Sequence, residues 1–144
     1  AEGQSIFNRG NFPADWQMDR PAMLQPFMPA IQKEGEYSLI FIDGEFSNAL
    51  IKRAAEGDYR IQSLYGGTEE AVTPSAEDRS AAAAIIASVP FETPLYARID
   101  MVRGPENSLL LMEAEMIEPY LYPTQGPELG ARLTAAINRR LTPS

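Results

Sequence analysis

Hydrophobic residues gather in two runs between Glu36 and Arg53, on either side of Asp43-Gly44. Tyr37 to Ile42 is rich in β-branched and aromatic residues, and a strand-like composition resumes from Glu45 to Lys52. Asp-Gly between two such runs is the strongest short hairpin signal, because it suits the positive φ angles of a two-residue turn. The pattern therefore predicts a β-hairpin over residues 36–53.

A second pair of strand-like runs covers Leu95 to Val102 and Ser108 to Ile117. The segment between them, Arg103-Gly104-Pro105-Glu106-Asn107, contains the Gly and Pro residues typical of a longer hairpin loop. These runs predict a second β-hairpin.

Two helices are predicted from their end signals. Ser75 is a capping hydroxyl, acidic residues follow it, and alanine dominates from Ser80 to Ser88. Near the C-terminus, Pro127 suits a first helical turn. After it, apolar residues recur with helical spacing at Leu129, Leu133, Ala136 and Ile137.

The remaining segments carry weaker signals. Ala22 to Phe27 favours an edge strand that runs into a loop, and residues 54–73 favour loops around a short extended piece at Tyr59 to Leu64. The element order ββ-α-ββ-α predicts an α+β fold, an antiparallel sheet of hairpins with helices packed on one face. We expect residues 1–21 to form an irregular, truncated N-terminal segment and residues 22–144 to form one subdomain.

Strand alternation in the second hairpin brings acidic side chains together. If the core-facing set is Ala97, Ile99, Met101, Met112, Ala114 and Met116, Asp100 shares the opposite face with Glu113 and Glu115. Placing Asp100 across from Glu113 puts Gly104 opposite Leu109 and leaves a four-residue loop, which is a usual hairpin length. Three carboxylates are then expected on one sheet face.

Two interpretations of that acidic face stay open. Like charges directly opposite on a sheet are destabilising, so a bound cation would explain them, and oxygen-only ligands suit Mg²⁺, Mn²⁺ or Ca²⁺. Alternatively, the face is solvated and Arg98 neutralises the acids, as is common on the outer face of an antiparallel sheet.

The composition of the chain excludes several classes of catalytic and metal-binding site. The 144 residues contain no cysteine and no histidine, which excludes thiolate nucleophiles, disulfides, Ser-His-Asp triads and His-based zinc sites. Twelve Lys and Arg against twenty Asp and Glu give a net charge of −8, which disfavours nucleic acid and anionic membranes as partners. With no signal peptide and no spanning segment in the sequence, we expect a cytoplasmic location.

Three segments resemble the C-terminal half of an ATP-grasp ligase: EYSLIFIDGEFSNALIKR from Glu36, YARIDMV from Tyr96 and LLLMEAEMIEP from Leu109. The similarity is strongest to the glutathione-synthetase-like and RimK-like branch, including ligases similar to the cycloserine-forming enzyme. It spans about residues 22–140. The resemblance implies a sheet-and-helix subdomain that holds ATP and Mg²⁺ or Mn²⁺ against an N-terminal half.

The resemblance also implies roles for individual residues. Gln25, Phe27 and Met28 fall on the hinge that binds adenine, Met112 on the adenine pocket, and Glu36 on the ribose carboxylate. Asp100 and Glu113 fall on metal ligands, and so does Glu115, where many relatives have Asn. Arg60 resembles the arginine that steadies the transferred phosphoryl group.

Other family features are missing from this sequence. We find neither the two phosphate-binding lysines nor the glycine-rich loop of the preceding half, since Lys33 and Lys52 both follow the hinge. We therefore expect part of a carboxylate–amine ligase that acts through an acyl phosphate on small-molecule substrates and is inactive without its N-terminal half. An exposed apolar wall would favour a homodimer. The alternative is a non-catalytic α+β binding or interaction module.

Overall fold

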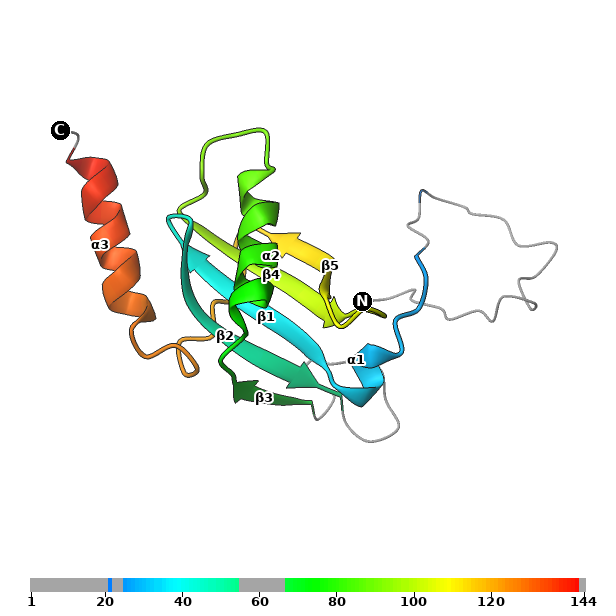
Figure 1. The fold of residues 1–144 in the computed structure, drawn as a ribbon. Coiled ribbons are helices and arrows are strands. Elements are labelled where there is room, and N and C mark those ends of the chain that lie inside the picture. The colour runs from blue at the N-terminus through cyan, green and yellow to red at the C-terminus, as the bar shows by residue number, and fades with distance from the viewer. Residues whose placement is uncertain (1–20, 22–24, 55–66, 143–144) are drawn as a thin grey trace.

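A five-stranded antiparallel sheet forms the centre of the molecule (Figure 1). The computed structural model describes Pro21 and residues 25–54 and 67–142. The strand order is β3-β2-β1-β4-β5. The strands are β1 (Glu36–Ile42), β2 (Glu45–Arg53), β3 (Thr68–Ala71), β4 (Tyr96–Arg103) and β5 (Leu109–Glu115), and the helices are α1 (Ala30–Lys33), α2 (Ala76–Ala87) and α3 (Leu129–Leu141).

The first predicted hairpin is confirmed as β1 and β2. Asp43 and Gly44 have φ angles of 54° and 80°, the sign that the expected two-residue turn requires. The pairing shifts between Ile40 and Phe41, because Asn48 faces Ile40 whereas Phe46 faces Phe41. This bulge lies near the turn, so the rest of the hairpin keeps a regular ladder.

The second predicted hairpin is confirmed as β4 and β5, and Asp100 lies opposite Glu113 as expected. The expected pairing of Gly104 with Leu109 is wrong, because Arg103 faces Leu109. A β-bulge causes the difference: Met101 faces Leu111, so Met112 is an extra residue on β5. The loop is therefore one residue longer than simple pairing from Asp100 predicts.

The two faces of the sheet carry separate apolar clusters. Helix α2 covers one face of the sheet (Figure 1). Its residues Ala82 and Ile86 form a buried cluster there with Leu39, Phe41, Ala49, Ala97, Ile99, Met101 and Leu109. On the other face, Leu129 and Ala136 of α3 join Ile40, Ile42, Leu50 and Tyr122. The α+β class is confirmed, but the expectation that both helices pack on one face needs correction.

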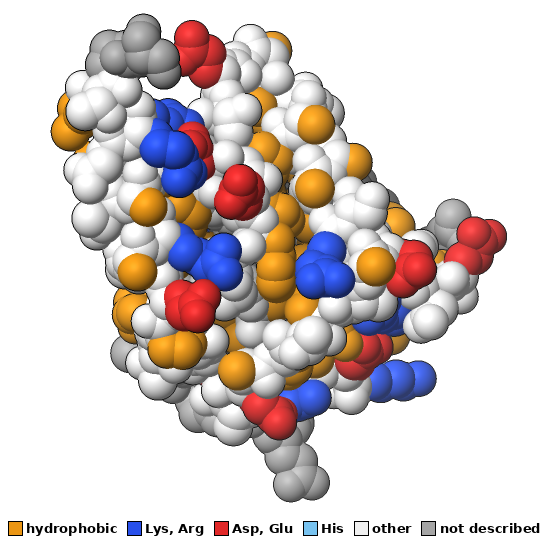
Figure 2. Space-filling view, turned by 60° about the vertical axis from the view of Figure 1, so that its left-hand side comes forward, with side chains coloured by type: hydrophobic (Ala, Val, Ile, Leu, Met, Phe, Trp, Pro, Cys, Tyr) orange, Lys and Arg blue, Asp and Glu red, His pale blue; other side chains and the backbone are white. Residues whose placement is uncertain are grey.

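The reason for the second covered face lies in β1 itself. Leu39-Ile40-Phe41-Ile42 is a continuous apolar run, which is typical of a strand that is buried on both sides. Figure 2, with the α3 side turned forward, shows hydrophobic side chains in a hollow between Arg and acidic side chains. The C-terminal helix thus covers the end of the sheet face nearest the first hairpin turn, and the polar residues of the same face lie beyond it.

The helix ends agree with their sequence signals except at the start of α3. The backbone N–H of Asp78 donates to Ser75 Oγ at 3.1 Å, which confirms the predicted cap of α2. Helix α3 begins at Leu129 with Glu128 as its N-cap, so Pro127 precedes the first turn instead of lying in it, and the helix ends with Arg139 and Arg140 in its last turn. Those arginines are favourable next to the negative end of the helix dipole, and both pair with Asp43 at the first hairpin turn.

The segments with weak sequence signals contain one strand that was not predicted, and their described part lacks one that was. Strand β3 was not expected, because Glu69 and Glu70 give it a poor strand composition, but charged residues are common on a sheet edge. The expected edge strand at 22–27 has no strand in its described part, residues 25–27, and the extended piece at 59–64 lies outside the described residues. Within the described ranges, no helix has the length and apolar character needed to cross a membrane.

Candidate functional site

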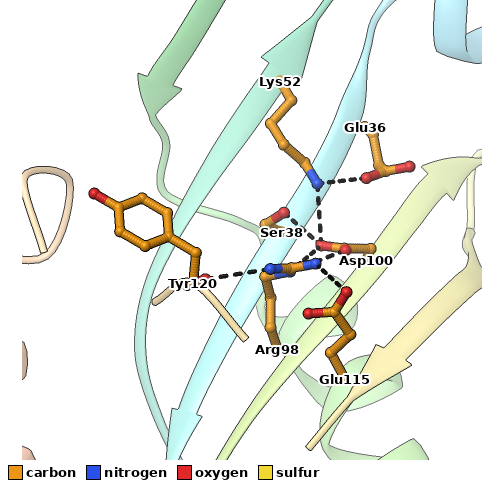
Figure 3. A network of polar contacts seen from close by, with 7 residues as sticks. All are labelled: Glu36, Ser38, Lys52, Arg98, Asp100, Glu115 and Tyr120. Carbon is orange, nitrogen blue, oxygen red and sulfur yellow. Dashed lines mark hydrogen bonds and ion pairs between the residues drawn. The ribbon is translucent and has the colours of Figure 1, made fainter. Parts of the chain in front are cut away.

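A buried polar network lies on the sheet face opposite α2, next to the apolar cluster under α3 (Figure 3). Asp100 is at its centre and is 1% exposed. Ser38 Oγ donates to its Oδ1 atom at 2.5 Å, and the Arg98 Nε–H group donates to both carboxylate oxygens at 3.1 and 3.0 Å. The carboxylate is therefore fixed in orientation by Ser38 on the neighbouring strand β1 and by Arg98 on its own strand β4.

Two cations connect Asp100 to the other acids of the network. Lys52 Nζ lies 2.5 Å from Glu36 Oε1 and 3.3 Å from Asp100 Oδ1. A terminal nitrogen of Arg98 lies 2.9 Å from Glu115 Oε1, and the other donates to the carbonyl oxygen of Tyr120 at 3.3 Å. Figure 3 shows Lys52 and Arg98 approaching Asp100 from two different strands, β2 and β4.

Strand register explains why these side chains meet. On the inner strands, Ser38 faces Asp100 and Glu36 faces Lys52. On the outer hairpin, Asp100 faces Glu113 and Arg98 faces Glu115. Because side chains alternate along each strand, these partners project on the same face. The network is thus a direct consequence of pairing between β2, β1, β4 and β5.

Burial and neighbouring charges shift the pKa values of several groups. Desolvation raises the pKa of Glu36, and Asp100 adds to that effect while Lys52 opposes it. Desolvation also raises the pKa of Glu113, with further contributions from Glu115 and Asp100. Burial would lower the pKa of Lys52, but Asp100 and Glu36 outweigh it and raise that pKa, so the ammonium is charged at neutral pH.

The three expected metal ligands are brought to adjacent strands, but Arg98 separates two of them. It pairs with both Asp100 and Glu115, as the alternative interpretation of the acidic face expects. The face is only partly solvated, however, since Arg98 and Asp100 are buried whereas Glu113 is exposed. Within the part of the chain that the structure describes, no three acidic side chains form a group that could hold a metal ion.

The expected nucleotide-binding residues are spread over several places. Gln25, Phe27 and Met28 lie before α1 in a segment without regular structure, and Phe27 is 42% exposed. Met112 is the extra residue of the β5 bulge and is half-buried. Glu36, at the start of β1, belongs to the network, whereas Arg60 lies outside the described residues.

Sequence reasoning missed Ser38, Lys52 and Tyr120 as members of the network. The signal for the first two was present, because Ser38 lies between Tyr37 and Leu39 and Lys52 follows the apolar run Ala49-Leu50-Ile51, both on strands of a predicted hairpin. An alternation of polar residues on a mostly apolar strand indicates a buried polar contact. No pattern could reveal Tyr120, since it contributes its backbone carbonyl.

Comparison with known proteins agrees with this architecture. The family model described as prokaryotic glutathione synthetase, ATP-grasp domain, matches residues 14–113. The cycloserine biosynthesis protein DcsG of Streptomyces lavendulae is 33% identical over 129 residues, which are 84% of this chain and 42% of DcsG. A glutathione synthetase of Parasynechococcus marenigrum is 31% identical over 84 residues, which are 58% of this chain and 27% of that protein.

A solved structure shows the same fold. The crystal structure of D-cycloserine synthetase DcsG superposes with a TM-score of 0.69 at 26% identity, and covers 82% of this chain and 42% of that one. The chain therefore spans less than half the length of the relatives it matches. The matched residues include the first hairpin and both acids of the Asp100–Glu113 pair. This chain belongs to the ATP-grasp family, in the group of prokaryotic glutathione synthetase ATP-grasp domains.

Proposed function

We propose that this chain is the metal- and nucleotide-binding portion of an ATP-dependent carboxylate–amine ligase. The observation that carries the proposal is the pairing of Asp100 with Glu113, on the sheet face that also holds Glu36 and Glu115. Four carboxylates and two cations, Lys52 and Arg98, make up that cluster. It therefore retains two uncompensated negative charges when all six groups are ionised.

The carboxylate chemistry of these residues suits a hard divalent cation, but in this structure the three proposed ligands are not gathered around one point. Carboxylate oxygens are the ligands that Mg²⁺ and Mn²⁺ prefer, and Mg²⁺ is usually bound by one or two carboxylates together with substrate phosphates. Asp100, Glu113 and Glu115 would hold the ion, with the phosphates of ATP completing its coordination. These residues would fix the position of the ion, which when bound would supply positive charge to offset the negative charge of the phosphates.

The resemblance to ATP-grasp ligases suggests roles on the nucleotide side. In the proposed site Glu36 binds the ribose hydroxyls, Gln25, Phe27, Met28 and Met112 surround the adenine, and Arg60 contacts the transferred phosphoryl group. A carboxylate of the substrate would attack the γ-phosphorus and release ADP, and an amine would then displace phosphate from the acyl phosphate. Positioning and charge neutralisation dominate phosphoryl transfer, so a chain without histidine is suited to it.

Several further parts of the proposal concern the whole protein. We infer that this portion is inactive by itself, because the phosphate-binding lysines and the acceptor site would come from an N-terminal half. The net charge of −8 disfavours nucleic acid and anionic lipid as partners. A cytoplasmic location remains a prediction from the sequence.

One observation favours the alternative, a non-catalytic binding module. Arg98 already neutralises Asp100 and Glu115, which a structural ion-pair network would also do. The two functions differ in what they require of Mg²⁺: the ligase needs the ion for any reaction, whereas the module has no use for it.

The ligase proposal is tested by trapping its intermediate. The longest form of the protein that contains this chain is incubated with Mg-ATP, a panel of small carboxylates and hydroxylamine, and hydroxamate formation is measured. Hydroxamate that depends on both ATP and Mg²⁺, and that is lost in the Glu113→Gln variant, supports the proposal. ATP-dependent hydroxamate formation at the same rate in wild type and Glu113→Gln would reject the site assignment.

A further inference from the structure

Lys52 lies between two acids that have different expected roles. Its ammonium group contacts Glu36, the proposed ribose ligand, at 2.5 Å and Asp100, the proposed metal ligand, at 3.3 Å. The side chain is 8% exposed and comes from β2, whereas its partners come from β1 and β4. A single lysine therefore joins three strands at this end of the sheet (Figure 3).

The contacts around Asp100 leave little capacity for another cation. Its Oδ1 atom is approached by Ser38 Oγ, by Lys52 Nζ and by Arg98 Nε, and its Oδ2 atom is bonded to Arg98 Nε. A divalent ion bound at about 2.1 Å from Asp100 Oδ1 would lie beside an ammonium group that is itself 3.3 Å from the same oxygen. Like charges at such a distance repel, and burial weakens the screening by water.

We infer that Lys52 is a positioning residue that keeps a free divalent cation away from Asp100 until a nucleotide is bound. The phosphates of the nucleotide are anionic, so they offer the ammonium group another partner and supply further oxygen ligands for the ion. Metal binding then depends on the nucleotide, and the acids stay charge-compensated before it arrives. This inference rests on the proposed function and concerns the order of binding at that site.

Removing the charge of Lys52 has opposite expected effects on the two ligands. With Lys52→Met, Arg98 is the one cation left among the six groups, so three negative charges remain uncompensated. Free Mn²⁺ should bind more tightly, by a factor on the order of tenfold. ATP itself is an anion, and its affinity in the absence of metal should fall. A merely structural lysine would weaken both.

The experiment measures Mn²⁺ binding by electron paramagnetic resonance, with and without ATP, in the wild type, Lys52→Met and Lys52→Arg. Lys33→Met is the matched control, because Lys33 is exposed and is the other lysine of the chain. The inference expects tighter free Mn²⁺ binding in Lys52→Met, and wild-type behaviour in Lys52→Arg and Lys33→Met. Circular dichroism checks that each variant is folded.

Several outcomes would overturn the inference. If Lys52→Met binds free Mn²⁺ no more tightly than the wild type, while the wild type binds Mn-ATP, the inference fails and the proposed function stands. If Lys52→Met does not fold, the wild type alone decides: free Mn²⁺ binding as tight as binding in the presence of ATP contradicts the inference, and weaker binding supports it. A wild type that binds no Mn-ATP overturns the proposed function together with the inference.

Discussion

Asp100 shows how much one buried residue depends on its neighbours. Its carboxylate is almost fully removed from water and is held by Ser38, Lys52 and Arg98. An isolated buried charge is costly, so each of these donors offsets part of that cost. Asp100→Asn would change the stability as well as the proposed metal site, whereas Glu113 on the exposed side of β5 is a cleaner position to test.

Ser38→Ala should lower the free energy of unfolding by about 1–3 kcal/mol, because Asp100 loses a buried hydrogen bond. Urea denaturation measures the change. Ser108→Ala, at an exposed position of the second hairpin loop, is the control and should be within about 0.5 kcal/mol of the wild type. Equal stabilities of the two variants would show that the hydroxyl contributes nothing.

Glu115→Asn should weaken Mg-ATP binding less than Glu113→Gln does. An Asn side chain still offers an oxygen to Arg98 and to a metal ion. We expect Glu113→Gln to lose about 1–3 kcal/mol of Mg-ATP binding free energy, and Glu115→Asn to lose less. Calorimetric titration compares them, and the reverse ranking would contradict the assigned roles.

At the scale of single elements, strong local signals in the sequence were sufficient to predict a turn and the start of a helix. Asp43-Gly44 predicted its turn, and Ser75 predicted the start of α2. The bulge at Met112 was not predictable, because an extra residue in one strand leaves no mark on the alternation of its neighbours. It shifts the pairing from Met101 to the loop, and the Asp100–Glu113 pair was predicted in spite of it because that pair lies on the other side of the bulge.

An ion pair fixes α2 to the sheet. Arg103 at the end of β4 contacts both carboxylate oxygens of Asp78, at 2.7 and 3.2 Å. Burial acts to raise the pKa of Asp78, but the hydrogen bonds and charge of Arg103 outweigh it and hold that pKa below its usual value. A depressed carboxyl pKa stabilises the folded state above the unfolded pKa, and that stabilisation is lost as the pH falls through the folded value.

Asp78→Asn should therefore be destabilised at pH 7 by about 1–3 kcal/mol relative to the wild type. The difference should shrink as the pH is lowered below the ordinary pKa of an aspartate, because the wild type then loses the same charge. Thermal unfolding from neutral to acid pH measures it, with the exposed Glu92→Gln as control. A difference that stays constant with pH would show that the charge of Asp78 is not what stabilises the helix.

At the scale of the whole molecule, the missing prediction was the second covered face of the sheet. The alternation in the second hairpin suggested one polar face, and that is correct around Asp100. The continuous apolar run of β1 required cover on both sides, which α3 supplies. Arg98 was weighed as a neutralising partner of the acids, but its burial and its contact with Tyr120 depend on the fold of the C-terminal segment.

The exposed apolar residues lead to a prediction about assembly. Leu110 and Leu111 on the edge strand β5 are 41% and 48% exposed, and Ile117 just after it is 87% exposed. Unpaired edges with apolar side chains favour association. We expect this chain to form a homodimer that Leu111→Lys weakens. Light scattering at high concentration tests this, and a monodisperse monomer in the wild type would contradict it.

The central claim is that acids on β4 and β5 make ATP binding depend on a divalent cation. It is tested most directly by calorimetric titration of ATP, with and without Mg²⁺, into the longest form of the protein that contains this chain. The wild type and Glu106→Gln, a control in the hairpin loop, should bind ATP more tightly with Mg²⁺, and Glu113→Gln should lose most of that gain. An equal effect of Mg²⁺ in Glu113→Gln and the wild type would contradict the account.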